Sequence, residues 1–324
     1  MPGFATHYLF GLTACQELPR GGTAACLRKY ARVFGLGLQG PDLFYYSLAS
    51  FLQPGGNPGI LAHHHSTGAL LTHMLESRSI FHDTRDRNIA SAYIMGFLGH
   101  YTLDTVCHPY IYAKSHRQSY GRDYFGHHVY LETDIDTELL MYYKGCAPSE
   151  FRQARTIALS RRQQKVVAAV LHYAYSATFP QYHFPEFRIR MAIRAMYSNL
   201  RLLRDPSGQK KVLARSIEAR LLGHAHISPL ITSDFYTFTV DPLNMRHRSW
   251  CNPWNGSGRS RRSFFDLMDQ ARAEYLDILD MAARLFGLPF GTPVYRQRLT
   301  ELSRRLGSKS YCTGLPEDES PKNS

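Results

Sequence analysis

The 324-residue sequence has no apolar run that approaches the ~18 residues of a membrane-spanning helix, so we expect no integral membrane protein. Residues 12–15, Leu-Thr-Ala-Cys, imitate a lipidation box. The segment before them has no Lys or Arg and too short an apolar region for a secretory signal. The sequence therefore predicts a cytoplasmic protein without a lipid anchor.

Cysteine and acidic residues are also limited. The six cysteines lie far apart without a CxxC pair, which argues against a disulfide framework and against a thiolate zinc site, and fits a reducing compartment. There are 26 Asp and Glu against 38 Lys and Arg, a formal net charge of +12. This excess favours an anionic partner, namely a phospholipid surface, a phosphodiester substrate or nucleic acid, and does not choose among them.

Histidine, in contrast, is concentrated in one part of the chain, because eleven of sixteen fall between His7 and His128. His100, Asp104 and His108 stand at i, i+4 and i+8, so a helix presents all three on one face. Zn²⁺ binds imidazole nitrogen and carboxylate oxygen without needing cysteine. We expect Pro109 to end this helix near His108. The alternative is three unrelated polar residues that line a cleft.

A second helical pair, His128 and Glu132, repeats the i, i+4 spacing. Asp136 continues the same face, where we expect it to orient the histidine. Two such helices, together with the clustering of histidines, predict a multinuclear metal site with nitrogen and oxygen ligands.

Three other segments hold isolated candidates. His7 stands near the amino terminus, where a lone histidine is usually a surface residue, and Asp42 opens a helix, where an acid is usually a cap. A triplet, His63, His64 and His65, follows a Pro- and Gly-rich link. Helical neighbours are ~100° apart, so only one or two members of the triplet can face a shared site.

Strand patterns are scarce, with FYTFTV at 235–240 the one plausible short strand, and amphipathic helices follow one another from Cys146 onward. With 44% hydrophobic residues the chain can bury a large core. We predict an all-α multi-helix bundle over residues 1–312, with a metal-site half (1–145) and a helical extension (146–312). The polar tail 313–324 is expected to be disordered.

Taken in order, FATHYLFG, GPDLFYY, LAHHHSTG, GFLGHYTLDTVCHPYI and HHVYLETDID resemble the zinc-dependent phospholipase C family. Its enzymes share an all-helical fold and a three-metal site with the S1/P1-type nucleases. These motifs cover roughly residues 1–145. WCNPW and SFFDLMDQA are similar to segments of bacterial members, which extends the resemblance over most of the chain.

The resemblance implies two or three Zn²⁺ per chain. It implies a first set of ligands in Asp42, one histidine of the triplet, His100 and Asp104. It implies a second set in His108, His128 and Glu132. A third ion would be held by His7 and by Asp104, which would bridge.

Two points of this ligand set stay open. His63 is preferred within the triplet because the family's ligand usually stands four residues before a threonine, here Thr67, and His64 is the reserve choice. Secreted members use a processed N-terminal amino group on the third zinc, whereas this chain begins Met-Pro, so the third site is not settled.

Three functions are compatible with these patterns. The first is a phospholipase C-like hydrolase of a phospholipid phosphodiester, with Asp42 orienting or deprotonating the attacking water. The second is an S1/P1-like nuclease or nucleotidase, in which Trp250 and Trp254 would stack on bases. The third is a non-enzymatic metal-binding or membrane-surface protein. The oligomeric state is not indicated.

Five tyrosines adjoin the candidate ligands and are candidates for a headgroup pocket, although ordinary packing is the alternative for each. They are Tyr45, Tyr46, Tyr101, Tyr110 and Tyr112.

Overall fold

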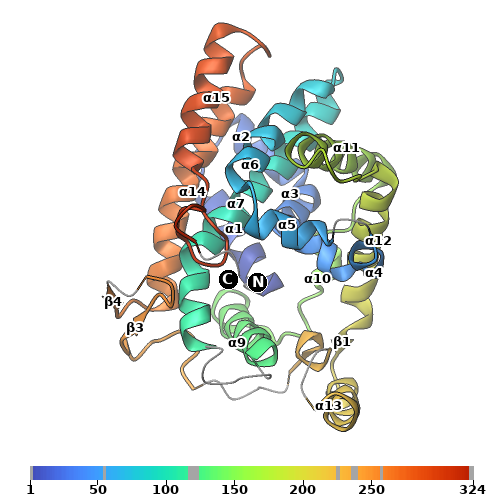
Figure 1. The fold of residues 1–324 in the computed structure, drawn as a ribbon, viewed down its shortest axis with the longest axis vertical. Coiled ribbons are helices and arrows are strands. Elements are labelled where there is room, and N and C mark those ends of the chain that lie inside the picture. Colours follow the sequence, from blue (N-terminus) through green and yellow to red (C-terminus); the bar gives the residue numbers. More distant parts are fainter. Residues whose placement is uncertain are drawn as a thin grey trace.

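The computed structural model describes residues 3–53, 56–115, 124–223, 227–234, 240–255 and 258–320. Helices contain 69% of these residues and strands 3%, which confirms the predicted all-α fold. Figure 1 shows the helices gathered around a long central helix, α7 (Thr84–Lys114), with α14 (Phe264–Phe286) along one side.

The first part of the chain supplies the helices that surround α7. They are α1 (Phe4–Glu17), α2 (Gly22–Lys29), α3 (Ala31–Gly37), the 3-10 helix η1 (Gly40–Tyr46), α4 (Leu48–Phe51), α5 (Pro58–His64), α6 (Thr67–Glu76), η2 (Ser77–Ile80) and, after α7, α9 (Tyr124–Lys144). The segment with the histidine triplet is divided between α5 and α6, because Ser66, whose φ is 55°, interrupts the helix.

The second part wraps the outside of this group (Figure 1). Its helices are α10 (Gln153–Thr156), α11 (Arg161–Thr178), α12 (Glu186–Leu202), α13 (Gln209–Leu221), η4 (Ser228–Leu230), α14 and α15 (Pro293–Leu306). Two short strand pairs join them, β1 (Arg204–Asp205) parallel to β2 (Thr232–Ser233) and β3 (Trp250–Cys251) antiparallel to β4 (Arg259–Ser260). Residues 235–239 of the expected strand lie outside the described residues.

Helix α7 is buried along most of its length, as expected of a helix that is apolar on several faces. Asp83 caps its first turn by accepting a hydrogen bond from the Asp86 backbone N–H. One hydrophobic core includes residues from both parts of the chain, from Phe4 to Tyr311. Within the described residues, no helix combines the length and apolarity needed to cross a bilayer.

The prediction that Pro109 ends this helix is wrong, because α7 continues through it to Lys114. Proline has no N–H to donate to the Thr105 carbonyl one turn earlier. Gly314 packs so closely on that carbonyl that a Cβ there would come within 2.3 Å of the oxygen. Tertiary packing of the C-terminal segment therefore covers the gap in the helix, and the helix can continue.

The prediction of a disordered tail is also wrong for residues 313–320. Thr313 is fully buried, and the Glu317 carboxylate accepts hydrogen bonds from the Thr67 backbone N–H (2.7 Å) and the Ser308 hydroxyl (2.7 Å). The contact with Thr67 attaches the segment to the first turn of α6. Composition alone could not show this contact, because it joins residues 250 positions apart.

Candidate metal centre

The candidate ligands lie on five helices, α7 among them, and meet at one face of α7. Each of these residues is at most 7% exposed. They are His7 on α1, Asp42 on η1, His63 on α5, His100, Asp104 and His108 on α7, and His128 and Glu132 on α9.

Asp104 lies at the middle of this cluster. Its Oδ1 is 3.1 Å from His7 Nε2, and its Oδ2 is 3.1 Å from His100 Nε2 and 3.9 Å from His63 Nε2. Asp42 Oδ1 lies 3.3 Å from His63 Nε2. The two oxygens of Asp104 thus face different histidines, an arrangement in which one carboxylate could serve two ions.

A second group lies further along α7. Glu132 Oε1 is 2.9 Å from His128 Nε2 and 3.8 Å from His108 Nε2. Its three members come from α7 and α9 and include no residue of the Asp104 group. His108 on α7 and the i, i+4 pair His128 and Glu132 on α9 therefore form a separate, compact site.

Three sets among the described residues have ligand atoms within 4.8 Å of one another. They are His7, Asp42 and His100; His63, His100 and Asp104; and His108, His128 and Glu132. Zinc lies about 2.0–2.2 Å from nitrogen and oxygen ligands, so ligand atoms on opposite sides of one ion are roughly 4 Å apart. These spacings fit zinc.

Hydrogen bonds to backbone carbonyls orient the histidines. The Nδ1–H groups of His63, His100 and His108 donate to the carbonyls of Gly59 (2.7 Å), Leu38 (3.1 Å) and Tyr311 (2.8 Å). His128 Nδ1 lies 3.3 Å from the Ser115 hydroxyl oxygen. With the proton on Nδ1, each ring directs the lone pair of Nε2 into the cluster.

Several inward-facing atoms make no hydrogen bond within the described part of the chain. These atoms are Nε2 of His7, His63, His100 and His108, Oδ1 of Asp42 and both carboxylate oxygens of Asp104. Leaving a buried polar atom unsatisfied costs about 1–3 kcal/mol, and more when it is charged. A set of lone pairs converging in a buried space fits a bound cation, which would satisfy them together.

The cluster has mixed protonation states. Burial lowers the pKa of His108 to about 3 and lowers the pKa of His128 and His7, so these rings are neutral at pH 7. Burial opposes ionisation of Asp104, but His100, His108 and His7 beside it lower its pKa well below the usual value. Neutral imidazole and carboxylate are the forms that bind metal.

His100 and Glu132 differ from these ligands. Burial opposes protonation of His100, but Asp104 and Asp42 beside it raise its pKa, and burial raises the pKa of Glu132 well above its usual value. A metal ion would therefore displace protons from both.

The family model described as zinc dependent phospholipase C matches residues 6–186 of this chain, more than half of it. The chain belongs to the zinc-dependent phospholipase C family. No curated protein and no solved structure matches it. The matched segment contains all the candidate ligands, so the resemblance seen in the ordered motifs is confirmed, and the three ligand groups agree with the predicted two or three zinc ions.

The structure separates the members of the histidine triplet of this phospholipase C family chain. His63 is buried and belongs to a ligand group. His64 and His65 are partly or fully exposed and belong to none of the groups in the described residues. The reserve choice His64 is therefore not brought to the cluster, because a rotation of ~100° per residue turns it away from the direction of His63.

Asp136 has a different role from the one expected. Its carboxylate accepts hydrogen bonds from the backbone N–H groups of Ala5 (2.9 Å) and Thr6 (2.7 Å) and from the Thr6 hydroxyl (2.6 Å). The prediction that Asp136 orients His128 is thus wrong. It instead caps the first turn of α1, the helix that carries His7.

Sequence reasoning missed the close backbone contacts that place His100. Gly37 of α3 and Gly96 of α7 touch, and a Cβ at Gly96 would lie 2.4 Å from the Phe34 carbonyl oxygen. This approach brings the Leu38 carbonyl to His100, one turn after Gly96. Gly40, with φ of 51°, follows, and a Cβ there would lie 2.2 Å from the His100 ring. The glycines of GLGLQG are the sequence feature that could have indicated this close backbone contact.

Two of the five tyrosines belong to the core. Tyr101 and Tyr110 are buried, and their hydroxyls donate to the carbonyls of Leu306 and Pro242. Tyr45, Tyr46 and Tyr112 are half-buried at the edge of the cluster. A headgroup pocket made of all five is therefore not formed.

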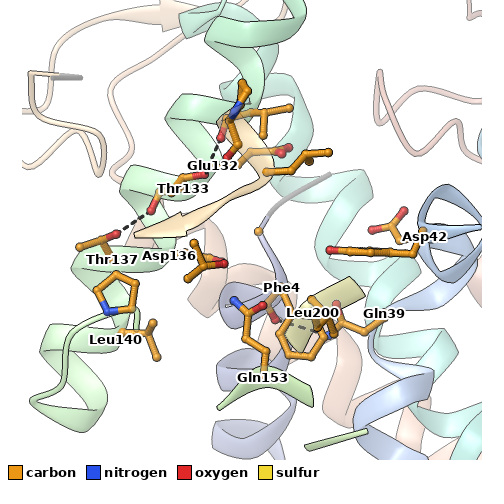
Figure 2. A pocket seen from close by; sticks show the side chains of 17 residues that line it. Phe4, Gln39, Asp42, Glu132, Thr133, Asp136, Thr137, Leu140, Gln153 and Leu200 are labelled. Atoms are coloured by element: carbon orange, nitrogen blue, oxygen red, sulfur yellow. Dashed lines mark hydrogen bonds between the residues drawn. The ribbon is translucent and has the colours of Figure 1, made fainter. Parts of the chain in front are cut away.

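A pocket of about 70 Å³ adjoins the cluster. Figure 2 shows Glu132 and Asp136 on the α9 side of this pocket and Asp42 on the other. Tyr46, Leu200 and Leu230 are among the side chains that line it. Asp42 and Glu132 thus belong both to the ligand groups and to the pocket wall, and a group entering there would meet the metal ligands.

Proposed function

We propose that this protein is a zinc-dependent hydrolase that cleaves the phosphodiester of a phospholipid and releases a phosphorylated headgroup. The observation that supports the proposal most is the buried convergence of eight ligands around α7, in a chain of the phospholipase C family. Clustered zinc, when bound, lowers the pKa of water and neutralises charge on a phosphate.

We assign the ligands as the resemblance to the family implies. The first ion would take Asp42, His63, His100 and Asp104; the second would take His108, His128 and Glu132; a third would take His7 and the second oxygen of Asp104. The distances that support these sets are the 3.1 Å contacts of Asp104 with His7 and with His100 and the 2.9 Å contact of Glu132 with His128. Leu38, Gly59 and Tyr311 would hold the rings in place through their carbonyls.

Asp42 is the proposed catalytic residue. Its carboxylate lines the pocket, so it can reach a water molecule that enters there. Burial opposes its ionisation, but His100 and His63 beside it lower its pKa, so it is ionised at neutral pH. An ionised carboxylate in this position can orient the water and accept its proton.

The test compares Asp42→Asn with His127→Ala in zinc-loaded protein acting on phosphatidylcholine in mixed micelles. We expect Asp42→Asn to lower kcat by about 10²–10⁴, the range for loss of an acid-base group, since an amide cannot accept the proton. His127 is exposed next to the proposed ligand His128, so its variant is the control and should keep full turnover. Equal activity of both variants would refute the role of Asp42.

A nuclease is the second candidate, and two ring contacts favour it. The Tyr112 ring lies 4.7 Å from that of His128 and 4.8 Å from that of Trp254, so an aromatic series leads to the second ligand group. Trp250, in contrast, packs on Tyr110 and donates its indole N–H to the Arg262 carbonyl. Cleavage of single-stranded DNA without cleavage of lipid would select this alternative.

A further inference from the structure

Helix α13 (Gln209–Leu221) has its polarity inverted relative to an ordinary surface helix. The two residues it buries are charged, Lys211 (7% exposed) and Glu218 (5% exposed). Its large apolar side chains are exposed, and Leu213, Ile217 and Leu221 at i, i+4 and i+8 form a stripe that is 63%, 48% and 77% exposed. A surface helix of a soluble protein normally buries such a stripe.

Polar contacts hold the helix in this orientation. Asp205 accepts a hydrogen bond from the Lys211 backbone N–H (2.9 Å), and the Lys211 ammonium lies 5.5 Å from the centre of the Tyr130 ring. Glu218 accepts hydrogen bonds from the backbone N–H groups of Ile227 and Ser228 at the start of η4. Turning the stripe inward would break these contacts, so its exposure is built into the fold.

The chain segment that contains the stripe, residues 187–233, has no exposed acid. Residues 187–233 contain nine Lys and Arg but only two acids, Asp205 and Glu218, and both acids are buried. Arg215 and Arg220 are exposed on α13. More exposed apolar side chains lie in the same segment, namely Leu202, Val212, Leu222 and Ile227. Exposed apolar and basic side chains without acids are typical of helices that lie at an anionic membrane surface.

This surface adjoins the pocket beside the metal ligands. Helix α13 packs against η4, and Pro229 and Leu230 of η4 line the same pocket as Asp42 and Glu132. Leu230 is 39% exposed, so it belongs to the pocket and to the outer surface. A lipid layer that contacts α13 would therefore also lie next to the pocket.

We propose that the α13–η4 surface (residues 209–222 and 227–230) docks the protein on an anionic phospholipid surface, with the apolar stripe in the interface and the arginines on lipid phosphates. The docking itself is independent of the reaction, and only the delivery of lipid to the pocket rests on the proposed function. A second copy of the chain fits the surface less well, because the segment's exposed charge has one sign and would repel itself.

The experiment measures binding of the full-length, zinc-loaded protein to sedimented vesicles of phosphatidylcholine, with and without phosphatidylglycerol. The test variant is L213Q/I217Q/L221Q. The matched control is I80Q/F290Q/V294Q, three exposed apolar residues (39%, 60% and 52% exposed) that lie outside residues 187–233. A single variant, L221Q, and the double variant R215Q/R220Q complete the set, and melting temperature and zinc content verify folding.

We expect the wild type to bind anionic vesicles more tightly than neutral ones and to lose this preference in high salt. The stripe variant should bind at least tenfold more weakly, R215Q/R220Q severalfold more weakly, and the control like the wild type. L221Q should weaken binding in the same direction, which keeps the test valid if the triple variant does not fold. Absence of vesicle binding by the wild type, or equal binding by the stripe variant, would overturn the proposal. A wild-type dimer that the stripe variant dissociates, without vesicle binding, would overturn it in favour of self-association.

Turnover of a soluble chromogenic phosphodiester separates this proposal from the proposed function. The stripe variant should hydrolyse it as the wild type does and lose activity on vesicles only. If the wild type binds vesicles but hydrolyses neither substrate, the docking surface stands and the proposed hydrolase fails.

Discussion

At the scale of single residues, Asp104 is the central member of the site, because its two oxygens face histidines from three helices. We expect Asp104→Asn to release more than one zinc per chain and His7→Ala to release at most one. A bridging carboxylate serves two ions, whereas His7 contributes to one. Elemental analysis of the purified variants, with His127→Ala as the control, measures this difference, and equal loss from both variants would contradict the bridging role.

The sequence could predict the parts of the site that depend on spacing within one helix. His100, Asp104 and His108, like His128 and Glu132, face the cluster as the i, i+4 rule predicts. The positions of His7, Asp42 and His63 beside Asp104 depend on tertiary packing, and only the family resemblance predicted them. The carbonyls of Leu38, Gly59 and Tyr311 could not be predicted, because every residue has a carbonyl and its direction is set by the fold.

At the scale of helices, the contact of α3 with α7 determines where His100 stands. We expect Gly96→Ala to lower the free energy of unfolding by about 1–3 kcal/mol, the usual cost of overpacking, because its Cβ would press on the Phe34 carbonyl and on Gly37. It should also weaken zinc binding by moving the Leu38 carbonyl from His100. Urea unfolding and zinc analysis measure both effects.

The control for this prediction is Gly22→Ala at the start of α2. A Cβ there meets no atom within 4 Å, and alanine favours the helix, so stability should stay the same or rise. If Gly96→Ala behaves like Gly22→Ala, the close approach of the two helices does not constrain the site.

Helix ends were harder to predict than helix faces. Pro109 is a strong local signal for a helix end, and the polar, acidic tail is a strong local signal for disorder. The contact of residues 308–320 with α6 and α7 overrides both signals. These contacts span about 200 or more positions of sequence. Local composition contains no information on them, whereas the periodic burial of a helix face does appear in the sequence.

At the scale of the whole molecule, bound zinc should join α1, η1, α5, α7 and α9, since its ligands converge only in the folded chain. We expect chelation to lower the melting temperature by several degrees, because metal at about 1,000 times its Kd adds about 4 kcal/mol to the folded state. Calorimetry before and after removal of metal tests this, and readdition of zinc should restore the transition. An unchanged melting temperature after verified metal loss would show that the helices hold together without it.

The central claim is that the buried cluster around Asp104 and Glu132 is a multinuclear zinc site, and the zinc content of protein purified from zinc-replete cells tests it most directly. Three groups of ligand atoms, two of which share His100, predict at least two zinc ions per chain. Two or more zinc ions per chain in the wild type, with fewer in Asp104→Asn, would agree with the account. Less than one zinc per chain in folded wild-type protein would contradict it.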